Sequence, residues 1–329
     1  MLRRGTLSST LIWVRFAKVV AFSSPLTKGG VRGVLSSGED LSRALKNMTE
    51  GTEPGRIGVI AGAGRFPFLV VEGAKRAGCH VTVVGLRGFA DPDLAACADD
   101  FRWSGLARMG QWVRILRRRR ASGVILAGSV KKTDMYGRLR LLRLLPDWTS
   151  IKIWFFKIAD KRNDTVLSAV ADEFERHGIT MQDCVEYTAE NMAPEGVLTR
   201  GQPSAAQLKD AEFGWRIAKE MGRLDIGQSI AVKETEVIAV EAIEGTDRMI
   251  ERADELCRQG GWTLVKVAKP DQDMRFDVPT VGPDTIAKLK QHGARMLVIE
   301  AGVTVVIDRE EMTSAADSAG IVVVSRTDG

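Results

Sequence analysis

A chain of 329 residues, of which 44% are hydrophobic, can bury two ordinary cores, because one domain usually takes about 100–200 residues. The net charge of +5 is too small to indicate a nucleic-acid partner by itself, and the four scattered cysteines argue against a disulfide framework or a structural zinc site. We therefore expect a two-domain protein from a reducing compartment.

Residues 1–53 do not share the pattern of the rest of the chain. Their apolar run at 11–22 is interrupted by Arg15 and Lys18, and a Ser- and Gly-rich stretch follows it. A membrane-spanning helix needs about 20 apolar residues, so this run is too short. We interpret 1–53 as a disordered or mis-annotated N-terminal extension, with an uncleaved targeting segment as the alternative.

From Arg56, short apolar strands alternate with amphipathic helices. We expect strands at 56–61, 80–86, 100–103 and 123–127, and helices at 66–76, 109–120 and 164–177. This alternation is typical of a Rossmann-like α/β domain with a mostly parallel sheet, which we assign to 54–187. Ligands on such sheets gather at the carboxyl ends of the strands.

The loop that follows the first strand contains a glycine turn. Gly62 and Gly64 resemble the turn that lets a phosphate approach backbone N–H groups, although Pro67 stands where the dinucleotide fingerprint has its third glycine. We expect a contact with a phosphate or nucleotide other than NAD, with a plain structural turn as the alternative.

The loop that follows the strand at 123–127 offers a hydroxyl and ammonium groups. Gly128, Ser129 and Lys131 are the candidates for a phosphate contact there. Solvated lysines before a helix are the alternative interpretation.

Residues 105–162 are strongly basic, with 15 Lys and Arg against 3 Asp and Glu. Arginines interleave with leucines at 136–145, and aromatic residues follow at 148–156. Such a mixture suits contact with anionic lipid, where each Lys or Arg contributes about 1 kcal/mol. A partly buried helix pair with snorkelling arginines is the alternative, and the absence of glycine-aromatic signatures argues against RNA.

The Pro- and Gly-containing stretch 188–203 indicates a linker. Beyond it, 204–329 predicts a smaller α/β domain with a mixed sheet, which begins with a helix capped by Ser204 that carries Leu208 and Trp215 on an apolar stripe. We expect a hairpin of strands at 229–233 and 237–241, strands at 263–268, 296–300, 303–307 and 321–324, and helices at 244–257, 284–291 and 309–318.

Four polar loops of this second domain place an acidic residue next to Gly or Pro: 225–228, 241–247, 269–277 and 300–302. Carboxylates that converged on one cleft would repel one another unless a divalent cation or a buried arginine neutralised them. Mg²⁺ (or Mn²⁺) suits oxygen ligands and binds substrate phosphates at the same time. These residues thus indicate metal-assisted phosphoryl chemistry.

Several motifs carry a family resemblance. They are G-R-L-D-I-G-Q at 222–228, V-E-A-I-E-G-T-D-R-M at 240–249, K-P at 269–270 and R-F-D-V-P-T-V-G at 275–282, with sparser matches at 62–67, 89–92 and 127–130. Together they resemble the LpxI-type UDP-2,3-diacylglucosamine pyrophosphatases over 56–325. The resemblance implies hydrolysis of UDP-2,3-diacylglucosamine to 2,3-diacylglucosamine 1-phosphate (lipid X) and UMP in lipid A biosynthesis, with Mg²⁺ or a similar cation and water attacking the α-phosphorus.

The resemblance also implies residue roles. Asp277 would be catalytic, with Arg275 and Lys269 as phosphate clamps, and Asp277 and Asp225 are the metal ligands that we expect. Structural alternatives stay open, because Asp277 could cap a turn or pair with Arg275, and Asp225 could mark a helix exit.

Further substrate contacts are expected at Gln228, Thr246, Asp247 and Thr280. Thr246 and Asp247 stand at a predicted helix start, where capping explains them equally well. Glu241 and Glu244 are weaker candidates.

A glycolipid substrate made in the cytoplasm would explain an enzyme without a spanning helix. We therefore expect a cytoplasmic protein that is peripheral to the inner membrane, without a nucleic-acid partner and with a homodimer as one option. Two other functions stay open: a non-catalytic module that binds UDP-sugars or anionic lipid, and a UDP-sugar transferase, which would release UDP in place of UMP.

Overall fold

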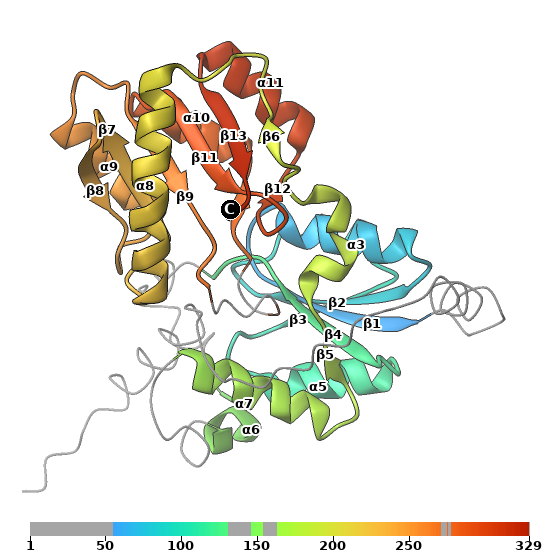
Figure 1. The fold of residues 1–329 in the computed structure, drawn as a ribbon. Helices are drawn as coiled ribbons and strands as arrows, with labels where there is room; N and C mark the ends of the chain where they lie inside the picture. Colours follow the sequence, from blue (N-terminus) through green and yellow to red (C-terminus); the bar gives the residue numbers. More distant parts are fainter. Residues whose placement is uncertain (1–54, 131–145, 154–162, 271–274, 276–277, 329) are drawn as a thin grey trace, which may run out of the picture. The chain divides into compact units, whose positions relative to one another are not determined.

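The computed structural model describes residues 55–130, 146–153, 163–270, 275 and 278–328 (Figure 1). The chain forms two compact units, Met1–Tyr187 and Thr188–Gly329. The extension expected at 1–53 and the leucine- and arginine-rich run at 136–145 lie outside the described residues. No helix within the described ranges is long and apolar enough to cross a membrane.

Unit 1 is built on a five-stranded sheet of order β3-β2-β1-β4-β5, in which every neighbouring pair is parallel. Its strands are β1 (Arg56–Ala61), β2 (His80–Leu86), β3 (Asp100–Ser104), β4 (Gly123–Ala127) and β5 (Thr180–Met181). Its helices are α3 (Phe66–Arg76), α4 (Leu94–Cys97), α5 (Met109–Arg118), α6 (Trp148–Lys152) and α7 (Asn163–Glu175). The predicted Rossmann-like domain is confirmed.

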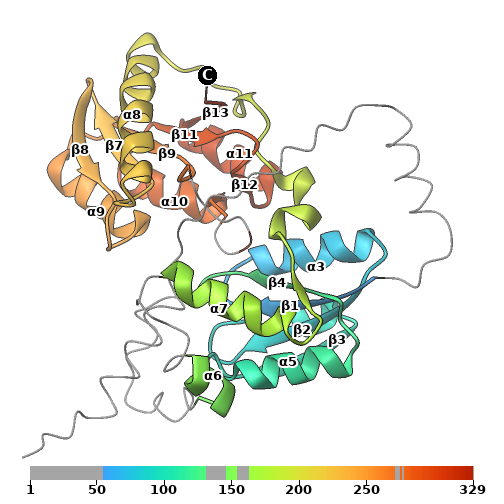
Figure 2. The same ribbon diagram turned by 60° about the horizontal axis from the view of Figure 1, so that its bottom comes forward.

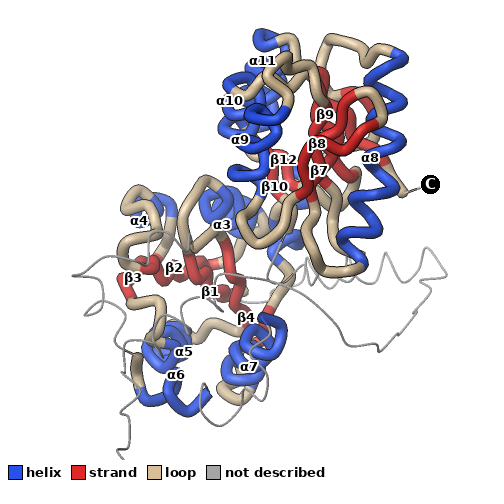
Figure 3. Tube along the Cα trace, turned by 90° about the vertical axis from the view of Figure 1, so that its left-hand side faces the viewer, coloured by secondary structure: helices blue, strands red, loops and turns tan. Residues whose placement is uncertain are grey.

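Helices cover both faces of this sheet (Figure 3), with α3 and α4 on one face and α5, α6 and α7 on the other. Strands buried on both faces need apolar side chains on both, which is why β1 and β4 are nearly continuous apolar runs. Val59, Val83 and Ile125 are fully buried at its centre.

The loops that leave β1 and β4 are joined backbone to backbone at the point where the strand order reverses. The N–H of Ala63 donates to the carbonyl oxygen of Ser129 over 2.7 Å, and the N–H of Ser129 donates back over 2.9 Å. Gly128 has a φ of +89°, and a Cβ there would lie 2.7 Å from the Ala63 oxygen. The contact therefore requires glycine at 128, whereas Gly64, with a φ of +97°, faces open space.

Unit 2 is built on a six-stranded mixed sheet of order β6-β13-β11-β9-β7-β8. Its strands are β6 (Gly196–Val197), β7 (Ser229–Lys233), β8 (Glu236–Val240), β9 (Thr263–Lys266), β11 (Met296–Glu300) and β13 (Val322–Arg326), and a separate pair is formed by β10 (Thr280–Val281) and β12 (Val305–Val306). Its α-helices are α8 (Ala205–Arg223), α9 (Thr246–Leu256), α10 (Pro283–Gln291) and α11 (Arg309–Ala319). The mixed sheet and the hairpin β7-β8 are as predicted.

Each face of this sheet has its own apolar cluster, because neighbouring strand residues point to opposite faces. On the face covered by α8, Trp215 packs in a cluster with Val265 and Val298. On the other face, α9, α10 and α11 pack through residues such as Leu289 in a cluster with Leu264 (Figure 2).

Three details differ from the sequence expectations. The stripe predicted for α8 is wrong at Leu208, which is 49% exposed, because the first turn of α8 contributes no residue to the cluster on its face. The strand predicted at 303–307 is only β12, which pairs with β10 outside the main sheet. The stretch 188–203 contributes β6, which pairs antiparallel with β13.

Gly128→Ala tests the close approach between the two loops of unit 1. Gly64→Ala is its control, because both positions have a positive φ and only Gly128 is crowded. We expect Gly128→Ala to lower the free energy of unfolding by roughly 1–3 kcal/mol more than Gly64→Ala, since its added Cβ meets backbone atoms. Urea unfolding measures the difference, and equal losses would contradict the close approach.

Candidate active site

The polar loops of unit 2 lie along one edge of its sheet, which we call the polar edge (Figure 1). β9 and β11 run parallel and end there. β7 runs antiparallel to β9, with Ser229 opposite Lys266, so β7 begins at this edge and β8 ends at it. The loops that meet here are 225–228, 241–247, 300–302 and the start of 269–277.

Lys269 and Asp225 form the closest contact between two of these loops. The Nζ atom of Lys269 lies 2.6 Å from the Oδ1 atom of Asp225. The lysine side chain is 11% exposed and the aspartate 49%. The pair thus holds an ammonium group at the polar edge while one side of its carboxylate partner stays open to solvent.

Asp225 also ends α8. Its N–H donates to the carbonyl oxygen of Gly222 over 3.1 Å, and the N–H of Ile226 donates to that of Met221 over 3.0 Å. This is the hydrogen-bond pattern of a helix that ends in a left-handed residue, and Asp225 has a φ of +56°. Glycine usually takes this position, so the aspartate is both the helix exit and the partner of Lys269.

Glu300, at the end of β11, is 8% exposed and contacts two neighbours. Its Oε2 accepts a hydrogen bond from the N–H of Ala268 over 2.8 Å, and its Oε1 lies 2.6 Å from the Nζ of Lys219 on α8. Lys219 also pairs with Asp328 over 2.8 Å. Glu300 therefore fixes the backbone immediately before Lys269.

The lysine of this network keeps its charge. Burial opposes the charge on Lys219, but hydrogen bonds with Asp328 and Glu300 outweigh burial and raise its pKa. Trp215 supports the network, because its Nε1–H donates to Asp328 over 2.8 Å and the Arg326 guanidinium lies 4.8 Å from its ring.

Sequence reasoning missed Lys219, Arg326 and Asp328 as members of this edge. One signal was present, since Lys219 follows Trp215 by four positions and so shares the stripe that faces the sheet. A charged residue on such a stripe indicates a buried ion pair. Arg326 ends a strand that neighbours β11, so the strand order would have placed it at the same edge.

A second group of hydrogen bonds links the loop 241–247 to β7. The Oγ1–H of Thr246 donates to Glu241 over 3.0 Å, and the Oγ atoms of Ser229 and Thr246 lie 3.3 Å apart. Next to Ser229, the Oε1 atom of Gln228 is buried and accepts no hydrogen bond from the described residues. An unpaired buried oxygen at this edge is a group that a bound ligand can satisfy.

Other predicted residues have partners elsewhere. Asp247 pairs with Lys288 on α10, and Glu244 lies 2.9 Å from Arg252. Thr280 contributes its carbonyl oxygen, which accepts a hydrogen bond from Lys266 over 2.9 Å. These contacts explain the three residues structurally.

The structure describes only some of the remaining predicted site residues. Arg275 is half-buried in a turn. Asp277 and Lys131 lie outside the described residues. Lys269 is therefore the member of the predicted catalytic set whose contacts are described most fully.

The metal site expected at Asp277 and Asp225 is only partly located, because Asp277 lies outside the described residues. The described residues contain no group of three or more His, Cys, Asp or Glu side chains that could hold an ion. Asp225, one of the two expected ligands, is paired with Lys269. We therefore derive no catalytic step through a metal ion.

In unit 1, the predicted phosphate loops have a structural explanation. A Cβ on Gly62 would lie 2.7 Å from the Ser129 oxygen, and the N–H groups of Ala63 and Ser129 bond to each other. These two N–H groups are therefore engaged within the fold. Gly64 and the Ser129 side chain lie at exposed positions.

The two units correspond to two known domains. Residues 56–190 match the family model of the LpxI N-terminal domain, and residues 194–324 match that of the LpxI C-terminal domain. The chain is also 35% identical over 282 residues to a protein of Caulobacter vibrioides named UDP-2,3-diacylglucosamine pyrophosphatase LpxI. The aligned region covers 82% of this chain and 96% of that relative. On these matches, the chain belongs to the LpxI family.

Proposed function

We propose that this chain hydrolyses the pyrophosphate of UDP-2,3-diacylglucosamine to lipid X and UMP in lipid A biosynthesis. Membership of the LpxI family and the activity in the name of the Caulobacter relative support the proposal. The structural observation that carries it is the pair of Lys269 and Asp225, which holds an ammonium group at the polar edge in the loop that leads to Arg275.

In the proposed reaction a water oxygen forms a bond to the α-phosphorus, and the bond from this phosphorus to the bridging oxygen breaks. The bridging oxygen leaves with the sugar phosphate as lipid X, the uridylyl group becomes UMP, and the protons of the water are released. Asp277 orients the water or accepts its first proton. Lys269 and Arg275 stabilise the charge on the transferred phosphoryl group.

Three further parts of the proposal are tested separately. Turnover with Mg²⁺, with Mn²⁺ and with a chelator tests the dependence on a divalent cation. Peripheral association with the cytoplasmic face of the inner membrane is supported by the basic segment 105–162, and cell fractionation tests it. Sedimentation velocity tests the homodimer.

Asp277→Asn tests the proposed base. Purified protein with UDP-2,3-diacylglucosamine should release UMP, and the variant should be slower by about 10²–10⁴-fold, because it can no longer accept the proton. Asp284→Asn is the control, since it removes an exposed carboxylate from the first turn of α10, seven positions further along the chain. Near-normal turnover of Asp277→Asn would contradict the role of Asp277, whereas UDP as the product of the unaltered chain would indicate a transferase.

Lys269→Met and Asp225→Asn, alone and combined, test the pair at the polar edge. We expect Lys269→Met to lower kcat/KM by about 10²–10³-fold and exposed Lys209→Met to have little effect. If Asp225 acts by holding Lys269, the double variant should be no slower than Lys269→Met, because nothing remains to be held. Additive losses would contradict this role and favour an independent one, such as a metal ligand.

A further inference from the structure

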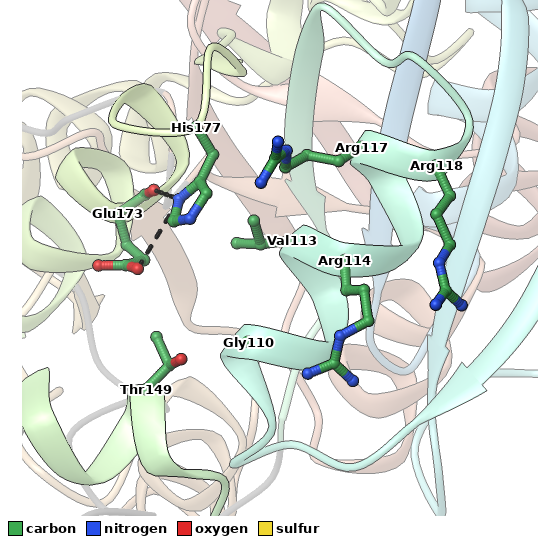
Figure 4. A pocket seen from close by; sticks show the side chains of 8 residues that line it. All are labelled: Gly110, Val113, Arg114, Arg117, Arg118, Thr149, Glu173 and His177. Atoms are coloured by element: carbon green, nitrogen blue, oxygen red, sulfur yellow. Dashed lines mark hydrogen bonds and ion pairs between the residues drawn. The ribbon is translucent and has the colours of Figure 1, made fainter.

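A polar pocket lies within unit 1, lined by residues of α5 and α6 and by residues at the end of α7. These helices cover one face of the sheet of unit 1 (Figure 2). The volume of the pocket is about 470 Å³, within the range of roughly 300–1,000 Å³ that is usual for small-molecule sites. The polar residues that line it are Arg114, Arg117 and Arg118 of α5, Thr149 of α6, Glu173 of α7, and His177 in the turn after α7 (Figure 4).

The wall between α5 and α6 is held firmly. Asp147 accepts hydrogen bonds from the N–H of Gln111 and from the N–H of Ser150, each over 3.0 Å, and the Ser150 hydroxyl accepts one from the N–H of Met109 over 3.1 Å. A Cβ on Gly110 would lie 2.6 Å from the Oγ1 of Thr149, so glycine lets α6 approach this closely. Thr149 is thereby placed against α5 before any ligand binds.

The pocket brings three arginine side chains together on one helix face. Arg114, Arg117 and Arg118 are exposed, and in the part of the chain that the structure describes none of them has an ion pair. Among the described residues of the lining, Glu173 is the one carboxylate, and it is 7% exposed and pairs with Arg176. Like charges gathered around one hollow repel one another, and an anion would relieve that repulsion.

The electrostatic surroundings of His177 include the positive charge of Arg117, one of these arginines. Its Nδ1 lies 2.8 Å from the carbonyl oxygen of Glu173, to which it must donate, because a carbonyl only accepts. Burial, together with the charges of Arg117 and Arg176, lowers the pKa of this histidine. Figure 4 shows the Arg117 guanidinium turned toward the imidazole ring.

We propose that this arginine pocket binds a phosphate-bearing anion. Guanidinium groups bind phosphate oxygens through paired N–H donors, and the Thr149 hydroxyl adds a further donor. The phosphate belongs either to a lipid headgroup or to a soluble molecule. Trp148, next to Thr149, is 67% exposed, and the Lys152 Nζ lies 6.0 Å from the centroid of its ring. Exposed tryptophans are common at membrane surfaces, so this residue is compatible with a lipid headgroup as the source. The inference does not depend on the proposed hydrolysis.

The test uses the full chain, the variant Arg114→Gln/Arg117→Gln, and a control of equal charge change, Arg102→Gln/Arg108→Gln, whose arginines are exposed and outside the pocket lining. Co-sedimentation with vesicles of phosphatidylcholine, with and without phosphatidylglycerol, tests the lipid source. Calorimetric titration with inorganic phosphate tests the soluble one. Circular dichroism checks that each variant folds.

We expect the pocket variant to lose about 30-fold in affinity for the anionic vesicles or for phosphate, at about 1 kcal/mol for each arginine, and the control to lose far less. Loss in the vesicle arm assigns a lipid headgroup, and loss in the phosphate arm alone assigns a soluble ligand. Equal losses of affinity in the two variants would show that binding depends only on the general surface charge, which would overturn the proposal. The absence of binding to both vesicles and phosphate would also overturn it.

Discussion

The polar edge of unit 2 depends on one buried carboxylate that must satisfy two partners. Glu300 accepts the N–H of Ala268 with one oxygen and binds the Lys219 ammonium group with the other. A carboxylate so buried is tolerated only when it is paired, so this network resists rearrangement. Lys219 belongs to α8, and Asp225, in the turn directly after α8, binds Lys269. The same helix therefore holds the exit of β9 at two points, through Glu300 and through Asp225.

Most of the fold could be predicted from the sequence, because each of the longer strands and helices carries its own apolar pattern or capping residue. Apolar runs such as 56–61 and 123–127 predict strands buried on both faces, and Ser204 predicts the helix start, where it forms a capping box with Gln207. Two-residue strands such as β6 carry no periodicity, so the sequence does not reveal them. The exposure of Leu208 was beyond prediction for another reason, since the stripe alone does not say where the sheet beneath the helix ends.

The site was predictable as a group of loops but not as a set of contacts. Strand order brings 225–228 and 241–247 to one edge, yet the partner of each charge depends on packing between residues far apart in the chain. Lys269 pairs with Asp225 at a separation of 44 residues, and Asp247 pairs with Lys288 on α10. Gly62 and Gly128 likewise match the phosphate-loop pattern, and the structure explains both by the approach of two loops.

In the proposed reaction, water attacks the α-phosphorus of UDP-2,3-diacylglucosamine. Hydrolysis in water labelled with oxygen-18, followed by mass spectrometry of both products, tests it most directly. We expect the label in UMP and none in lipid X, because the new bond forms at the uridylyl phosphorus. Label in the sugar phosphate would contradict attack on the α-phosphorus.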